Sequence, residues 1–159
     1  MSRRAPGMVL GIFLGMVLTA GVGCNPFRSG SVKGHVEAKG ELGNWVLEKG
    51  NCYSGQREQY FGVIGFGPDG SGIAIKLVKD GVRGWTAIVN QASSCRNEAE
   101  KGGCKAVVFT PNDCTTFDVD VTRTNTTVND VRALDGTLRI ECSNDTSSVK
   151  GNLTFDHCH

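Results

Sequence analysis

The chain has 159 residues, which is enough for one domain of ordinary size and too few for two. It carries 17 Lys and Arg against 16 Asp and Glu, and two of the basic residues, Arg3 and Arg4, lie at its start. Without those two, 15 basic residues face 16 acidic ones. This near-neutral balance, with no basic cluster, argues against a nucleic-acid partner.

Residues 1–23 have the pattern of a signal peptide. The segment Met1–Pro6 is basic, residues 7–23 carry no charge, and small residues end the apolar run. A transmembrane helix needs about 20 apolar residues, whereas this run is shorter, is interrupted by Gly and is followed by Asn25-Pro26. The sequence therefore predicts export, with residues 24–31 as a lipidated Cys and short polar tether and residues 32–159 as one domain.

The end of the leader, Val22-Gly23-Cys24, resembles the lipobox, at which bacterial lipoproteins are cut and acylated on the Cys. Gly21 departs from that pattern, because a large aliphatic residue usually stands there, and an ordinary secretory cut is the alternative. The cysteine count favours the lipid: seven is odd, and removing Cys24 leaves six. The resemblance implies a palmitate-type anchor on Cys24 and, because Asn25 follows, sorting to the outer membrane. The alternative is that the protein is soluble and is secreted or periplasmic.

After the tether, apolar and polar residues alternate with period two, which is typical of β-strands. Turn signals such as Gly67-Pro-Asp-Gly70 separate the apolar runs, and no window keeps a helical period beyond one turn at Glu98–Lys101. The sequence predicts an all-β domain, an antiparallel β-sandwich or small barrel of roughly eight to ten strands braced by disulfides.

Strands are expected around residues 32–38, 45–49, 60–66, 73–78, 85–89, 105–109, 117–121, 136–142 and 151–158, with Asp135-Gly136 opening the last pair. The expected core consists of the apolar residues on one face of these strands: Val36, Trp45, Leu47, Phe61, Val63, Ile73, Ile75, Leu77, Trp85, Val107, Phe109, Phe117, Val119, Leu138, Ile140, Leu153 and Phe155.

Export makes disulfide bonds the default for the six remaining cysteines, since their spacing lacks the C-x-x-C pairs of a typical metal site. These are Cys52, Cys95, Cys104, Cys114, Cys142 and Cys158. Six cysteines allow 15 pairings, of which two are suggested locally. Cys95–Cys104 would close a short polar loop. Cys142–Cys158 would join two strands that repeat one pattern, but Cys158 is one residue out of phase, so this bridge requires a bulge or strand end near His157.

Two further motifs have ordinary explanations. Gly65–Gly70 matches G-x-G-x-x-G, but a strand and not a helix follows it, so we interpret it as a hairpin turn and not a nucleotide site. Asp118 and Asp120 lie on one face of a strand, where a solvated surface is expected and Ca²⁺ or acid–base chemistry is the alternative.

The C-terminal tetrapeptide Asp156-His157-Cys158-His159 could hold zinc or copper. In the alternative, Cys158 is disulfide-bonded and the imidazoles are solvated tail residues or pack against a strand. His157 is in phase with Leu153 and Phe155, which favours a partly buried side chain. Motifs for nucleophilic catalysis are missing from the sequence, so we expect no catalytic activity and no cofactor.

Taken together, the sequence predicts a membrane-anchored cell-envelope lipoprotein that acts as a binding or structural module and is not an enzyme. An envelope protein or a polysaccharide is the expected partner, besides the membrane itself. The alternative is a metal-binding or enzymatic envelope protein that uses His157, His159 and nearby carboxylates.

Overall fold

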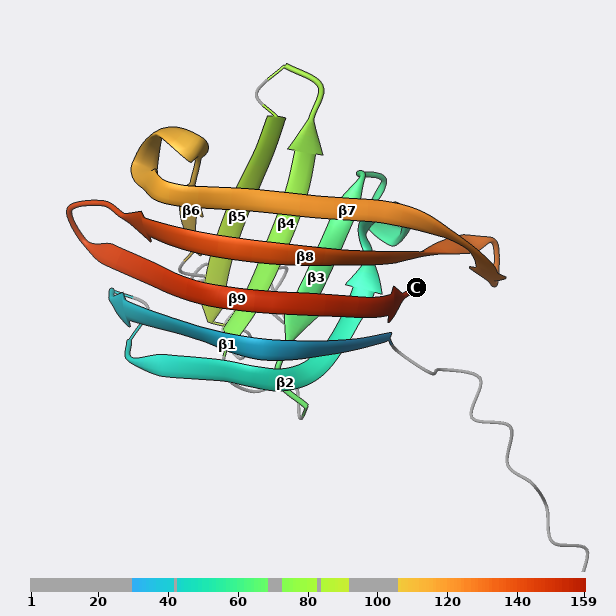
Figure 1. The fold of residues 1–159 in the computed structure, drawn as a ribbon, viewed down its shortest axis with the longest axis horizontal. Helices are drawn as coiled ribbons and strands as arrows, with labels where there is room; N and C mark the ends of the chain where they lie inside the picture. The colour runs from blue at the N-terminus through green and yellow to red at the C-terminus, as the bar shows by residue number, and fades with distance from the viewer. Residues whose placement is uncertain (1–29, 42, 69–72, 83, 92–105) are drawn as a thin grey trace, which may run out of the picture.

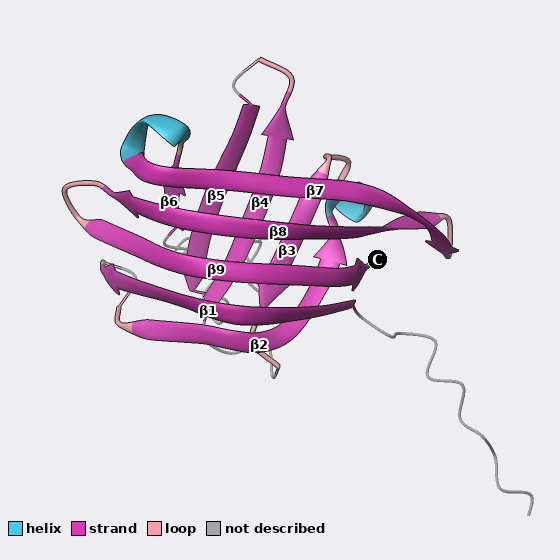
Figure 2. Cartoon of the chain, in the orientation of Figure 1, coloured by secondary structure: helices cyan, strands magenta, loops and turns pink. Residues whose placement is uncertain are grey.

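The computed structural model describes residues 30–41, 43–68, 73–82, 84–91 and 106–159. Nine β-strands and two short 3-10 helices account for most of these residues (Figures 1 and 2). In chain order they are β1 (Gly30–Gly40), β2 (Trp45–Ser54), η1 (Gly55–Glu58), β3 (Gly62–Phe66), β4 (Ile73–Asp80), β5 (Gly84–Gln91), β6 (Ala106–Phe109), η2 (Pro111–Asp113), β7 (Cys114–Val128), β8 (Val131–Ser143) and β9 (Ser147–Cys158).

All nine strands form one antiparallel sheet, in the order β6-β5-β4-β3-β2-β1-β9-β8-β7. Figure 1 shows this sheet folded into two layers, with β7, β8, β9, β1 and β2 in front and β3 to β6 running across behind them. β2 joins the layers, because its residues 45–52 pair with β1 and its residues 51–54 pair with β3. The predicted all-β, barrel-like fold is confirmed, and the sheet is nearly closed.

Buried apolar side chains form one core cluster, and the largest of them include Phe109, Phe155, Ile75 and Leu77. The predicted core residues that are buried are Val36, Leu47, Val63, Ile75, Leu77, Val107, Phe109, Leu138, Ile140, Leu153 and Phe155. Others pack against this core but stay partly exposed: Trp45, Phe61, Trp85, Phe117 and Val119. The side chain of Ile73 lies outside the described part of the chain.

Several strands are longer than the sequence predicts, most of all β7, which extends well beyond residues 117–121 at both ends. β2 continues past Asn51 to Ser54, where it pairs with the back layer. β8 begins at Val131 and runs through Asp135-Gly136, which the sequence marks as the start of the strand. Gly136 serves close packing instead, because a Cβ added there would lie 2.4 Å from the carbonyl oxygen of Asp120.

The turn between β7 and β8 is Asn129-Asp130, a two-residue loop between the paired residues Val128 and Val131. Its φ angles of 50° and 63° are those of a type I′ turn, which suits the twist of a hairpin. Asn and Asp tolerate this left-handed backbone better than most residues do. The hairpin therefore has a local cause in the sequence.

The motif Gly65–Gly70 begins within β3, which pairs with β4 from Gly62 opposite Val78 to Phe66 opposite Ala74. The predicted hairpin is confirmed, and β4 offers no helix N-terminus at this point. Gly65 also lets the two layers pack, since a Cβ there would lie 2.9 Å from Cε1 of Phe155. In the described part of the chain, the two 3-10 helices have four and three residues, and neither is long or apolar enough to span a membrane.

Candidate functional site

A β-bulge shapes the C-terminal end of β9. Phe155 pairs with Gly136 of β8 and Cys158 pairs with Leu134, so two residues, Asp156 and His157, lie opposite Asp135 alone. His157 is the extra residue of the bulge, and its backbone lies in the left-handed region, with φ of 51°. Its backbone N–H donates to Oδ1 of Asp135 at 2.7 Å, which satisfies the amide that the bulge removes from the ladder.

The bulge changes which side chains face the core. A regular strand would place His157 on the same side as Phe155, and the sequence predicts a partly buried imidazole on that ground. This prediction is wrong: the His157 side chain is 55% exposed, and Cys158 takes the buried position instead. A bulge does lie at His157, as a Cys142–Cys158 bridge would have required, but it serves a different disulfide.

The described disulfides are Cys52–Cys158 and Cys114–Cys142, with Cα atoms 5.0 and 3.9 Å apart. The predicted Cys142–Cys158 bridge is wrong, because β8 and β9 are antiparallel and place the two residues at opposite ends of the pair. Cys142 lies opposite Val149 and Cys158 opposite Leu134. The predicted Cys95–Cys104 bridge lies outside the described residues and stays a prediction for non-reducing peptide mapping.

The Cys52–Cys158 disulfide crosses the first residue of β1, whose two neighbours in the sheet are β2 and β9. Gly30 lies between them, paired with Cys52, and a Cβ there would lie 2.4 Å from the carbonyl oxygen of His157. Glycine therefore allows the bulged strand end to pack tightly against β1. The disulfide fixes the residue that follows His157, so the bulge is held from both sides.

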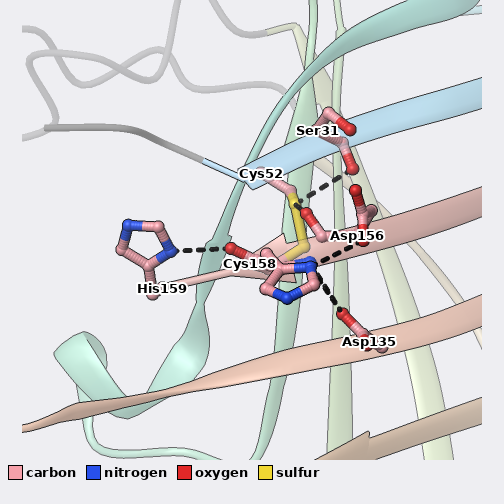
Figure 3. Close-up of a disulfide and its surroundings, with 7 residues drawn as sticks. Ser31, Cys52, Asp135, Asp156, Cys158 and His159 are labelled. Carbon is pink, nitrogen blue, oxygen red and sulfur yellow. Dashed lines mark hydrogen bonds and ion pairs between the residues drawn. A yellow bond between two sulfur atoms is a disulfide. The ribbon is translucent and has the colours of Figure 1, made fainter. Parts of the chain in front are cut away.

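Three potential metal ligands meet at the bulge. Nδ1 of His157 lies 2.7 Å from Oδ1 of Asp156 and 3.7 Å from Oδ1 of Asp135. One ligand atom from each of the three residues lies within 4.8 Å of the other two. The hydrogen bond that Asp156 accepts from the ring, and then the charge of Asp135, raise the pKa of His157 above its ordinary value. Figure 3 shows both carboxylates on one side of the Cys52–Cys158 disulfide.

His159, the second predicted imidazole, does not join this cluster. Its ring lies on the other side of the strand end from Asp135 and Asp156 (Figure 3), and its Nδ1 lies 2.7 Å from the carbonyl oxygen of His157. The residue is only 9% exposed. The structure therefore replaces the predicted pair of imidazoles by one imidazole and two carboxylates.

A hollow of about 460 Å³ adjoins the cluster on the outer face of the front layer. Asp135 and Asp156 line it together with Asp120 of β7 and Lys33 of β1, and most other lining groups are hydroxyls. Asp118 and Asp120 are both exposed, as the solvated strand face predicts, but Asp120 also borders this hollow. Three carboxylates and one lysine thus line the hollow beside the bulge.

A second hollow, of about 490 Å³, lies at the opposite end of the front layer, beside Cys114–Cys142. Both signs of charge line it, from Glu37, Lys39, Glu141 and Lys150. Lys150 is already paired with Glu141 at 2.7 Å. This hollow therefore offers mixed polar contacts and no concentrated charge.

The third histidine, His35 on β1, also has two acidic neighbours. Its Nε2 lies 3.1 Å from Glu37 and its Nδ1 lies 3.5 Å from Glu48 of β2. The hydrogen bond with Glu37 is the main cause that raises the pKa of His35 and lowers the pKa of Glu37. Each carboxylate contacts a different ring nitrogen, so the two do not converge.

Sequence reasoning missed Asp135 as a site residue, because Asp-Gly is typical of a turn. The one feature of the sequence that indicates Asp135 is the out-of-phase Cys158, because it points to a bulge opposite some residue of the preceding strand. Comparison of the chain with protein-family models, with curated proteins and with solved structures finds no significant match.

Proposed function

We propose that the chain is an exported cell-envelope lipoprotein whose β domain acts as a binding or structural module without catalysis. One observation carries this proposal: four cysteines of the domain are joined in two disulfides. Disulfides form and persist in oxidising compartments and are rare in the reducing cytosol. With the predicted Cys95–Cys104 bridge added to these two, Cys24 is the odd cysteine of the seven, which supports its use as the lipid attachment site.

The anchor would place one end of the domain near the membrane. Cys24 lies six residues before Gly30, where β1 begins, and a chain of that length spans at most about 20 Å when extended. The Cys52–Cys158 end would therefore lie close to the lipid headgroups. Asn25 supports the outer membrane as the destination, by resemblance to the lipoprotein sorting signal.

The other end of the front layer would then face away from the membrane. The hollow beside Cys114–Cys142 lies at that end. β1 also finishes there, and at the rise of a β-strand its 11 residues span about 33 Å. Figure 1 shows β1 running along the front layer from one end to the other. Its charged and hydroxyl side chains suit a polar partner. An envelope protein or a polysaccharide is the partner class that we propose for this surface.

Intact mass and fractionation of the native protein test the anchor. We expect the wild-type chain in the membrane fraction, cut before Cys24 and carrying the added mass of acyl chains. The Cys24→Ala variant should lose that mass and leave the membrane fraction. Unlipidated wild-type protein in the soluble fraction would overturn the lipoprotein assignment and favour the soluble secreted or periplasmic alternative.

A second candidate function is the metal-binding or enzymatic role expected from His157, His159 and nearby carboxylates. The metal-binding half is favoured by one observation, the convergence of Asp135 and Asp156 on Nδ1 of His157. His159 is not part of that arrangement. No observation favours the enzymatic half, so we do not carry it further.

A further inference from the structure

We propose that Asp135, Asp156 and His157 bind one divalent transition-metal ion of the zinc and copper class at the bulge of β9. This inference rests on the second candidate function and not on the lipid anchor, so either proposal can fail without the other. It narrows the ligands to one imidazole and two carboxylates, and it removes His159 from the site.

The spacing of the ligand atoms fits a small metal ion. Zinc takes nitrogen and oxygen ligands at about 2.0–2.1 Å, so two ligand atoms of a tetrahedral site lie about 3.3 Å apart. The two His157–carboxylate separations, 2.7 and 3.7 Å, lie on either side of that value. Rotations of side chains that already face one another would bring the three atoms to one ion without moving the strands.

The ligand types also select among ions. An imidazole nitrogen suits zinc and copper, whereas calcium and magnesium prefer oxygen ligands alone. Two carboxylates supply two negative charges, and Asp120 adds a third at the edge of the same hollow. Lys33 is the one basic residue among the groups that line this hollow. The local charge therefore attracts a divalent cation.

The surroundings leave room for the remaining ligands of the ion. The side chains of Asp135, Asp156 and His157 are 42%, 61% and 55% exposed. Water or a second molecule could therefore complete the coordination from the side of the hollow, as in metal sites that keep an open position.

The site stands on fixed backbone, and not on a free tail. Asp135 lies between Leu134 and Gly136, which both pair with β9. Cys158, the residue after His157, is joined to β2 by its disulfide with Cys52. Preorganised ligands lose less conformational entropy when they bind. The tail is thus converted into a defined set of ligands by the bulge and the disulfide.

His35 provides a matched control within the same chain. It is an exposed histidine with two carboxylates, but Glu37 and Glu48 contact different nitrogens of its ring. An ion bound at one nitrogen of His35 would meet only one of the two carboxylates. A site that depends on convergence should therefore form at His157 and not at His35.

Isothermal titration calorimetry with Zn²⁺ and with Cu²⁺ tests the proposal on the full chain carrying Cys24→Ala, so that neither a lipid nor a free thiol at that position contributes. We expect one ion per chain. Removing the imidazole by His157→Asn should weaken binding by at least about tenfold, as should Asp135→Asn and Asp156→Asn, and His35→Asn should leave it unchanged. Asn is chosen for His157 because it tolerates positive φ. In the Asp135→Asn variant, the amide oxygen would keep an acceptor for the bulge N–H.

Thermal unfolding and mapping of the two described disulfides confirm that each variant is folded. Binding that survives His157→Asn at full strength would overturn the proposal. So would a correctly folded Cys24→Ala chain that binds neither ion. Equal losses in His157→Asn and His35→Asn would also overturn it, because binding would then follow exposed histidines in general.

Discussion

Two histidines of this domain, His35 and His157, have the same kinds of neighbour and a different geometry. Their side chains are 51% and 55% exposed, and each lies within 4 Å of two carboxylates. The carboxylates around His35 contact different nitrogens of the ring. Those around His157 converge on Nδ1. The same kinds of neighbour therefore give two different arrangements of ligand atoms around the ring.

Both histidines lie at a β-bulge, because Gly34 and His35 of β1 lie opposite Glu48 of β2 alone, but only His157 of the two has a left-handed backbone. Glu37 lies on the strand of His35, two residues along, and Glu48 comes from β2, so the flanking side chains approach the ring separately. At His157 the bulge places two residues opposite one, which brings Asp156 and Asp135 to the same nitrogen. A bulge by itself therefore does not create the convergence, and the two sites differ in where their carboxylates lie around the ring.

Removing the disulfide next to His157 should have the largest effect, because it lowers the free energy of unfolding and releases the bulge. The Cys52–Cys158 bridge spans 106 residues, and the loop-entropy relation gives about 5 kcal/mol for its removal by Cys52→Ala with Cys158→Ala. The Cys114–Cys142 bridge spans 28 residues and gives about 4 kcal/mol for the corresponding alanine pair. Urea unfolding of both variants measures the two losses.

Only the Cys52→Ala, Cys158→Ala variant should also weaken metal binding at His157, because, of the two disulfides, only Cys52–Cys158 adjoins the bulge. If the Cys114→Ala, Cys142→Ala pair weakened it equally while remaining folded, the disulfide next to His157 would have no special role.

A substitution of each histidine by a β-branched residue should have the next largest effect. Valine strongly disfavours the positive φ of His157, and His157→Val should lower the melting temperature by on the order of 5 °C. His35 lies within strand β1, where valine is a favoured residue, so His35→Val should leave it nearly unchanged. Differential scanning calorimetry compares the two. A larger loss for His35→Val would contradict the bulged geometry.

The smallest effect concerns the protonation of His35. Because the hydrogen bond with Glu37 is the main cause that raises the pKa of His35, Glu37→Gln should bring that pKa back toward its ordinary value. NMR titration of the His35 ring measures it. Glu48→Gln, which removes a weaker contributor, is the control and should lower the pKa less.

The same pair sets a pH window for stability. The raised pKa of His35 gives a contribution that is fully present below its unfolded pKa and is lost as pH rises through its folded pKa. The lowered pKa of Glu37 gives one that is present above its unfolded pKa and is lost as pH falls through its folded pKa. The pair should therefore stabilise the fold most between the unfolded pKa of Glu37 and the unfolded pKa of His35. Denaturant unfolding across pH checks this.

Much of the fold could be predicted because strand periodicity and turn chemistry are local. The alternation of Leu138 and Ile140, and of Leu153 and Phe155, matches the strands and buried faces of the structure. The pairing of Cys52 with Cys158 could not be predicted, since it depends on β1 lying between β2 and β9. That neighbourhood joins strands far apart in the chain and leaves no trace in any short segment.

Only part of the candidate site could be predicted from the sequence. His157 and Asp156 stand together in the chain, but their orientation depends on the bulge, and period two alone predicts the opposite face for His157. Asp135 lies 21 residues before Asp156 and enters the site only through the register of β8 against β9. His159 looked equivalent to His157, but its ring lies on the other side of the strand end, next to the carbonyl oxygen of His157.

The central claim is that convergence on one nitrogen makes His157, and not His35, a metal ligand. NMR spectra of both imidazoles in one sample of the Cys24→Ala chain, recorded as Zn²⁺ is added, test it most directly. The account predicts that the His157 signals shift and saturate at one ion per chain while those of His35 stay in place. Equal shifts of both rings, or no shift of His157, would contradict it.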